Sequence, residues 1–194
     1  MWDREAEGYD RQIAFFERVL FEGGREWACS QARGDVLEVA IGTGRNLPFY
    51  PPEVRITGVE LSPAMLAIAR ERAKRLERAA SFVEGDAQRL PFPSESFDAV
   101  VCTLSLCNIP DVGAAVVEMR RVLRQAGRLL LVDHIRSSVR LVRWIQRLME
   151  LLTVRLGGDH LVRRPLEAVV RAGFVLERHH RSKWGIVERV AARK

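Results

Sequence analysis

The stretch Val36-Leu37-Glu38-Val39-Ala40-Ile41-Gly42-Thr43-Gly44-Arg45-Asn46 decides the fold of this chain. Its apolar start is typical of a buried strand, and it leads straight into a turn with two glycines. Glycines suit such a turn because the backbone bends sharply and a ligand can approach it without meeting a Cβ atom. The stretch therefore predicts a strand from Val36 to Ala40 that ends in a ligand-binding loop.

Strand-like apolar runs alternate with helix-period segments on either side of this stretch, which predicts βαβ units. The expected strands are Val36 to Ala40, Arg55 to Glu60, Ser81 to Glu84, Phe97 to Thr103, Arg128 to Asp133, Phe174 to His180 and Gly185 to Ala192. The expected helices are Pro63 to Arg78, Val112 to Arg124, Leu141 to Arg155 and Arg164 to Ala172, preceded by one within residues 11 to 31. Only a short turn separates the last two strands, so they should form an antiparallel hairpin. We expect an α/β, Rossmann-like fold with a seven-stranded, mainly parallel sheet.

The composition favours one folded domain. The 194 residues suffice for one α/β core, and 47% hydrophobic and 29% charged residues are typical of a globular protein. No apolar run approaches the roughly 20 residues that span a bilayer, and the charged N-terminus does not resemble a signal peptide. We therefore expect a single cytoplasmic domain over residues 1–194.

The net charge and the cysteines indicate no specific binding partner. The formal net charge is +6, and basic surfaces attract nucleic acids and anionic membranes. All but three of the 31 basic residues are arginines scattered among acidic residues, which favours a solvated surface and leaves a binding role open. Cys29, Cys102 and Cys107 form no C-x-x-C or Cys/His array, so the sequence predicts reduced thiols and no metal site.

Acidic residues follow two further strands. The second strand ends in Gly58-Val59-Glu60, where a ribose diol would sit in a nucleotide-binding fold, although such acids also cap helices. The third is followed by Glu84-Gly85-Asp86-Ala87, and Phe92 to Val100 leads into the fourth. In this order, over roughly residues 34 to 134, the motifs resemble the class I S-adenosylmethionine (SAM)-dependent methyltransferases, especially the branch of the ubiquinone/menaquinone C-methyltransferases.

The resemblance implies a class I methyltransferase fold, SAM as cofactor and S-adenosyl-L-homocysteine as product. Glu38, Gly42 and Gly44 would lie at the methionine part, and Glu60 would accept hydrogen bonds from both ribose hydroxyls. Leu61 and Met65 would pack on the adenine, Asp86 would accept from its amine, and Ala87 would offer its N–H. The full set of expected cofactor contacts is Tyr9, Glu38, Ala40, Gly42, Gly44, Asn46, Glu60, Leu61, Met65, Asp86, Ala87 and Thr103.

Three positions refine this expectation. Ala40 stands where the family usually has glycine, and its methyl group should be tolerated if φ stays negative. Leu47, the third residue after Gly44, occupies a glycine position of the pyrophosphate-binding motif, which argues against NAD. Tyr9 belongs to a Trp2–Asp10 segment similar to one that closes over SAM in relatives; simple helix packing is its alternative.

Methyl transfer from a sulfonium is a direct displacement, so a base is needed only if the acceptor must lose a proton. His134 follows the fifth strand at the rim where substrates enter α/β sheets, and it is one candidate. His160, in the glycine-containing turn 157–161, is the second. A purely structural role is the alternative for both histidines.

The region after the fifth strand is where this family places its substrate cover. Residues 141–152 form an amphipathic helix whose apolar positions include Trp144, Ile145, Leu148, Met149 and Leu152. Three interpretations of this helix are open: it is buried on the sheet, it forms a lid on an apolar acceptor pocket, or it lies on a membrane surface. We expect residues 136–165 to cover the substrate and residues 1–33 to form an N-terminal helical cover.

Three short stretches, Tyr50 to Pro52, Val101 to Cys107 and Gly158 to Leu161, also resemble the methyltransferase-like thiol S-methyltransferases. The expected acceptor is a small, lipophilic thiol, quinol or phenol, or a lipid amine, with peripheral membrane contact left open and the oligomeric state undetermined. No nucleic-acid partner is expected, because Asn108-Ile109-Pro110-Asp111 lacks the doubled proline and aromatic residue of a base-binding tetrad. A nucleic-acid methyltransferase and a non-catalytic SAM-binding regulator remain the rival functions.

Overall fold

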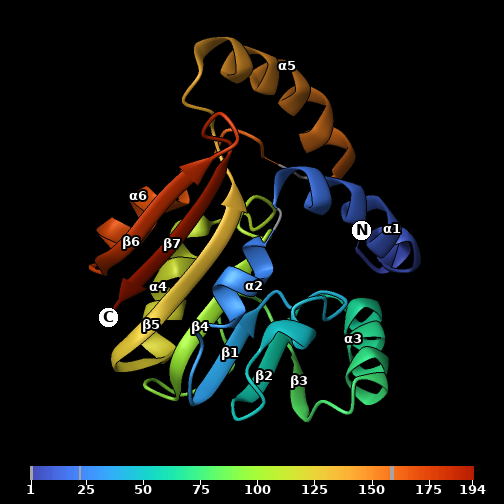
Figure 1. The fold of residues 1–194 in the computed structure, drawn as a ribbon, viewed down its shortest axis with the longest axis vertical. Helices are drawn as coiled ribbons and strands as arrows, with labels where there is room; N and C mark the ends of the chain where they lie inside the picture. The colour runs from blue at the N-terminus through green and yellow to red at the C-terminus, as the bar shows by residue number, and fades with distance from the viewer. Residues whose placement is uncertain (1, 22, 158–159) are drawn as a thin grey trace.

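The computed structural model describes residues 2–21, 23–157 and 160–194. In this part of the chain, helices cover both faces of a seven-stranded sheet (Figure 1). The strands are β1 Asp35–Val39, β2 Arg55–Glu60, β3 Ala80–Glu84, β4 Phe97–Thr103, β5 Leu123–His134, β6 Val175–Ser182 and β7 Val187–Arg193. The helices are α1 Trp2–Leu20, α2 Gly24–Cys29, α3 Pro63–Arg75, α4 Val112–Val122, α5 Arg140–Gly157 and α6 Pro165–Arg171, with a short 3₁₀ helix η1 at Leu47–Phe49.

The strand order is β3-β2-β1-β4-β5-β7-β6. β1 pairs in parallel with β2 and β4, whereas β7 runs antiparallel between β5 and β6. The order turns back between β1 and β4, and open α/β sheets bind their ligands beyond the carboxyl ends of the strands at such a point. The predicted fold class, including the antiparallel hairpin, is confirmed.

Two apolar layers hold the sheet between its helices. α4 and α6 cover one face, where Val116, Met119 and Val169 are fully buried against strand residues. α2 and α3 contribute Cys29 and Leu66 to the layer on the other face. These layers fix the strand ends that carry the site.

Two predicted elements differ most from the structure, and most of the others differ by one to three residues at their ends. Instead of one helix within residues 11–31, α1 ends at Leu20 and α2 begins at Gly24, because Gly23 takes a left-handed φ of 65°. β5 begins at Leu123, earlier than predicted, because Leu123 already pairs with Phe97 of β4. Ala126 has a left-handed φ of 62°, so the regular alternation of side chains along the strand is broken there. The start of this longer strand therefore has no clear alternating pattern.

Helices α1 and α5 lie outside the two covering layers. α1 packs beside α3, and α5 projects beyond the ends of the strands (Figure 1). Among the described residues, no helix is both long enough and apolar enough to cross a bilayer.

Candidate active site

A cavity of about 770 Å³ opens at the carboxyl ends of the parallel strands. Its wall consists of the loops after β1, β2, β3 and β4, with residues of α1, β5 and α5. Nine predicted site residues line it: Tyr9, Ala40, Gly42, Glu60, Leu61, Met65, Asp86, Ala87 and His134. The other predicted residues, Glu38, Gly44, Asn46, Thr103 and His160, are not part of the wall as described.

The loop after β1 follows a left-handed path at three positions. Gly42 and Gly44 have φ values of 56° and 77°. A Cβ atom at Gly44 would lie 2.9 Å from the Leu47 side chain, whereas one at Gly42 would meet nothing within 4 Å, since it would point into open space. Ala40 has a φ of 54°, so the negative φ under which its methyl group would be tolerated freely is not met. The loop imposes a conformation that favours glycine, and Ala40 adopts it at a cost of roughly 1 kcal/mol.

Glu60 joins the tip of β2 to this loop. Its carboxylate accepts hydrogen bonds from the backbone N–H of Gly42 at 3.1 Å and of Leu61 and Ser62 at 3.0 Å each. Burial raises the pKa of the Glu60 carboxyl, and these three amides oppose the rise. The role of helix cap falls to Ser62, whose hydroxyl accepts from the Met65 N–H at 3.2 Å. Glu60 is therefore a carboxylate already fixed by backbone amides in the cavity wall.

The loop after β3 brings the second predicted acid to the same cavity. Oδ1 of Asp86 accepts the Gln88 N–H at 2.8 Å, which holds the carboxylate in a tight turn. Ala87 lies next to it in the wall, while Met65 is buried and Leu61 is exposed on the β2 side. One end of the cavity thus offers two carboxylates beside apolar surface.

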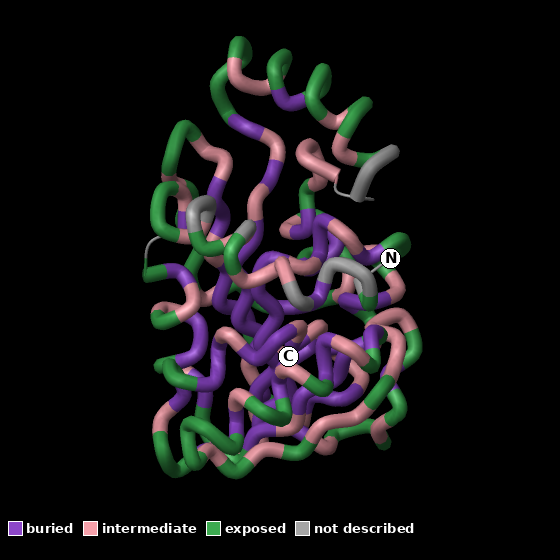
Figure 2. The backbone as a smooth tube through the Cα atoms, turned by 90° about the vertical axis from the view of Figure 1, so that its right-hand side faces the viewer, coloured by how far each residue is buried: buried purple, intermediate pink, exposed green. Residues whose placement is uncertain are grey.

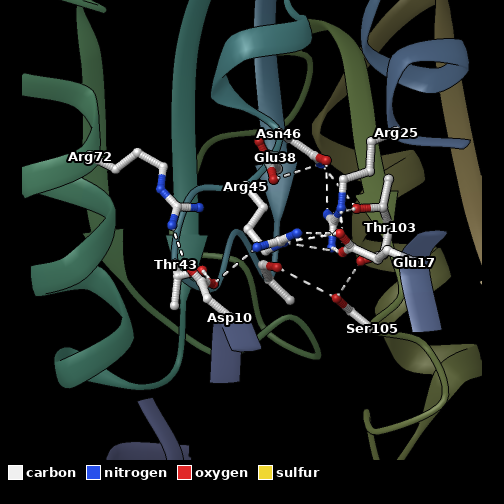
Figure 3. A network of polar contacts seen from close by, with 11 residues as sticks. Asp10, Glu17, Arg25, Glu38, Thr43, Arg45, Asn46, Arg72, Thr103 and Ser105 are labelled. Carbon is white, nitrogen blue, oxygen red and sulfur yellow. Dashed lines mark hydrogen bonds and ion pairs between the residues drawn. The ribbon is translucent and has the colours of Figure 1, made fainter. Parts of the chain in front are cut away.

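Behind the wall, Glu38, Asn46 and Thr103 form a buried polar cluster (Figure 3). Asn46 Nδ2 donates to Glu38 Oε1 at 2.9 Å and to Thr103 Oγ1 at 3.0 Å. The Tyr50 hydroxyl donates to Glu38 Oε2 at 2.9 Å. Burial raises the pKa of Glu38 to about 7, although Tyr50, Arg25 and Asn46 oppose the rise. These residues support the loop from behind rather than from inside the cavity.

Arg25 links this cluster to α1, a contact that the sequence did not reveal. Its Nη1 donates to Asn46 Oδ1 and Thr103 Oγ1, both at 2.9 Å, and its Nε donates to Glu17 Oε1 at 2.7 Å. Glu17 also accepts from Arg45 Nη2 at 2.5 Å (Figure 3). Burial disfavours the ionised form of Glu17, but the two arginines outweigh it and lower its pKa. A 78-residue separation between Arg25 and Thr103 leaves no local signal for this network.

A second set of contacts ties α1 to the glycine loop and α3. Asp10 accepts from the Thr43 hydroxyl at 2.7 Å and pairs with Arg72 (Figure 3). Tyr9, the residue before Asp10 in α1, lines the cavity, and burial raises the pKa of its phenol to about 12. Tyr9 is therefore a neutral hydroxyl at neutral pH. The structure does not describe the side chain of Trp2, the third residue of the predicted segment.

The other end of the cavity is mainly apolar. Its wall there contains Ile13, Leu20, Phe21, Leu104, Ile109, Leu161 and Ile186. Leu104 follows β4 directly with a φ of 55°, an unusual backbone conformation for a leucine and one that concentrates at functional sites. This end can accept an apolar molecule.

Cys107, Asp133 and His134 meet where β4 and β5 end. One potential ligand atom of each lies within 4.8 Å of the others, although the sequence predicted no metal site. Thiolate, imidazole and carboxylate are a donor set that zinc accepts. Asp133 Oδ1 also lies 3.5 Å from His134 Nδ1, close enough to orient the ring and stabilise it once protonated. The same trio could therefore hold a metal ion or support a base.

His160, the second predicted histidine, lies beside the cavity wall. Its backbone N–H donates to the Cys107 carbonyl oxygen at 3.2 Å, and its Nδ1 lies 3.7 Å from Glu150 Oε1. Gly158 and Asp159 of the same predicted turn are outside the described residues. The catalytic role of His160 stays a prediction.

Helix α5 meets the cavity with only part of its surface. Gln146, Met149 and Thr153 line it. Of the five apolar residues expected to form a lid, only Met149 lines the cavity; Met149 is half exposed, and Trp144, Ile145, Leu148 and Leu152 are exposed as well. α5 thus contributes one edge to the cavity wall, and its widest apolar face points away from the cavity.

A Rossmann-like sheet with an antiparallel C-terminal hairpin, a glycine loop after β1 and acids after β2 and β3 defines the class I methyltransferases. Residues 37–131 match the family model described as a methyltransferase domain. A thiol S-methyltransferase of Homo sapiens is 32% identical over 174 residues, which cover 86% of this chain and 70% of the relative. The chain belongs to the SAM-dependent methyltransferase family.

Two further comparisons agree. A demethylmenaquinone methyltransferase of Deinococcus radiodurans is 44% identical over 101 residues, 50% of this chain and 42% of that protein. A solved structure of a SAM-dependent methyltransferase from Thermotoga maritima shares the fold, with a TM-score of 0.76 at 23% identity. The match covers 100% of this chain and 100% of that chain. The chain spans only about half the length of several curated relatives.

The cofactor of this family, SAM, fits the residues present. Glu60 offers a fixed carboxylate in the wall, and Gly42 leaves the loop surface open where a side chain would intrude. The buried Leu47 lies beside Gly44 at the position where the pyrophosphate-binding motif has its third glycine. The site therefore suits SAM better than a dinucleotide.

Proposed function

We propose that this chain transfers the methyl group of SAM to a small, lipophilic acceptor bound at the apolar end of the cavity. The observation that carries the proposal is one continuous cavity with two acids at one end and apolar side chains at the other. Ligand pockets range from roughly 300 to 1,000 Å³. About 770 Å³ supports room for a cofactor together with a small acceptor.

In this proposal the β2 and β3 loops hold the nucleoside. Glu60 accepts from the ribose hydroxyls, Asp86 accepts from the adenine amine, and the Ala87 N–H donates to the ring. Leu61 and Met65 pack on the adenine. The loop residues Ala40, Gly42 and Gly44 hold the methionine part, and Tyr9 covers it from α1. Glu38, Asn46 and Thr103 act as positioning residues, since they brace this loop and Arg25 from behind.

His134 is the proposed base for an acceptor that must lose a proton. When bound, SAM supplies a methyl carbon on a positively charged sulfur. The bond from that carbon to sulfur breaks as the bond to the acceptor forms, leaving S-adenosyl-L-homocysteine. His134 takes the acceptor proton and passes it to water, while Asp133, 3.5 Å away, stabilises the protonated ring.

Three acceptor classes fit the apolar end: a thiol, a quinol or phenol, and a lipid amine. The relatives with quinone and thiol acceptors support the first two classes. A lipophilic acceptor also agrees with peripheral membrane contact through α5. Incubation of the protein with labelled SAM and one representative of each class, followed by product mass, tests the proposal and identifies the acceptor atom.

The same experiment separates the rival functions. A methylated small molecule supports the proposal. If the protein binds SAM but forms no methylated product with any acceptor class or with a cell extract, it would be a non-catalytic regulator. Label appearing in RNA or DNA, and in none of the small molecules, would make it a nucleic-acid methyltransferase.

A further inference from the structure

Helix α5 has one narrow face attached to the body of the protein. Gln146 is buried there; its Oε1 accepts from the Ser137 N–H at 2.7 Å, and its Nε2 donates to the Ile135 carbonyl oxygen at 3.0 Å. Met149 and Thr153 extend this side into the cavity wall. In the described part of the chain, α5 makes no extended contact with another helix or strand. The helix is therefore held mainly along one edge.

Much of α5 is exposed (Figure 2), and the exposed side opposite Gln146 is apolar. At 3.6 residues per turn, its side chains share a sector about 120° wide. They are Leu141, Trp144, Ile145, Leu148, Leu151 and Leu152, each between 44% and 69% exposed. Soluble monomers seldom expose so continuous an apolar surface, and such surfaces mark contacts with proteins or membranes. We therefore expect this apolar sector to contact a binding partner.

Arginines border the apolar sector on one side. Arg140, Arg143 and Arg147 follow one another around the helix next to Leu151, and no carboxylate forms an ion pair with them among the described residues. Arg136 lies close by; partial desolvation lowers the pKa of its guanidinium, and the charges of Arg143, Arg164 and Arg147 lower it further. Of this group, Arg164 has a carboxylate partner, Glu167. Positive charge is thus concentrated beside the apolar surface.

We propose that α5 docks flat on an anionic phospholipid bilayer. The apolar sector enters the boundary between headgroups and acyl chains, and Arg140, Arg143 and Arg147 meet the lipid phosphates at its edge. A basic border beside a broad apolar face is the pattern of helices that bind in this way. A symmetric contact with a second copy fits less well, because it would bring the arginine borders of both copies into one interface.

Docking in this orientation has a consequence for the cavity. Met149 and Thr153 line the cavity from the same helix, so the bound bilayer lies next to the cover of the acceptor end. A lipophilic acceptor can then pass from the bilayer into the cavity past α5. This route rests on the proposed function, whereas docking itself does not.

Co-sedimentation of the full chain with vesicles tests the inference. Phosphatidylcholine vesicles that contain phosphatidylglycerol should bind the protein at low salt, and phosphatidylcholine alone should bind it far less. The double variant Arg143→Gln, Arg147→Gln should bind about 30-fold more weakly, since each arginine near an anionic surface adds about a fivefold gain. The matched control Arg75→Gln, Arg171→Gln removes two exposed arginines from α3 and α6 and should bind like the wild type.

The apolar sector needs its own variant. Leu148→Ser should reduce binding even at low salt, whereas Val117→Ser, which changes an exposed apolar residue on α4, should not. Absence of vesicle binding by the wild type at low salt would overturn the inference, as would equal losses in the α5 and control variants. A concentration-dependent dimer that Leu148→Ser disrupts, without vesicle binding, would assign the face to a second copy. SAM binding is measured separately, without lipid. A protein that binds SAM but no vesicles overturns the docking inference alone, whereas loss of SAM binding counts against the proposed function.

Discussion

Replacing Glu60 by glutamine should weaken SAM binding about 30- to 150-fold. Glutamine matches the shape of the carboxylate but not its charge. A hydrogen bond to a charged group contributes roughly 1.5–3 kcal/mol, against roughly 0.5–1.5 kcal/mol for a neutral one. Two ribose hydroxyls would therefore lose about 2–3 kcal/mol together, and each 1.4 kcal/mol is a factor of ten in affinity.

Titration calorimetry with SAM measures this change. Glu84→Gln is the matched control, because Glu84 stands opposite Glu60 in the β2–β3 register but is exposed. Circular dichroism must show that the Glu60 variant folds, since the amides of Gly42 and Ser62 also bind this carboxylate. Excess NAD should leave both titrations unchanged. A folded Glu60→Gln protein with wild-type SAM affinity would refute the assignment.

Three further measurements test the site. Because burial raises the pKa of Glu38 to about 7 from its ordinary 4.5, the folded chain binds this proton more tightly, and stability should fall by about 3 kcal/mol as pH rises from 4.5 to 7. Urea unfolding of Glu38→Gln should lose this slope; equal slopes in both proteins would contradict it. His134→Asn should lower kcat by about 10²- to 10⁴-fold with an acceptor that must lose a proton, and leave the SAM Kd unchanged; an unaltered kcat would exclude His134 as the base. Dialysis against a chelator should leave methyl transfer intact, whereas a loss restored by zinc would show that Cys107, Asp133 and His134 hold a metal.

The fold was predictable because its signals are local. β2 and β4 begin and end at the predicted residues, since apolar runs with clear turns bound them. Glu60 and Asp86 were predictable as cavity residues because parallel strands present their carboxyl ends at one edge. The split between α1 and α2 was missed, because apolar residues continue in helical spacing across Gly23.

The missed parts of the site depend on contacts between distant segments. Arg25 was not singled out, because the partners that give it meaning, Asn46 and Thr103, are far away in sequence. The approach of Cys107 to His134 was likewise hidden, since cysteine spacing alone cannot show which strand ends meet. The orientation of α5 could not be predicted, because periodicity shows that the helix has an apolar face but not which way that face points.

Helix α1 is held over the cavity by charged contacts of Glu17 with Arg25 and Arg45, and of Asp10 with Arg72. Exchange of the cofactor past this helix requires those contacts to loosen, as covering segments do in many enzymes. Salt screens such partly buried ion pairs less than exposed ones, but it does not weaken apolar packing at all. Rising ionic strength should therefore shorten the residence time of S-adenosyl-L-homocysteine and make the opening of α1 a rate that the ionic environment controls.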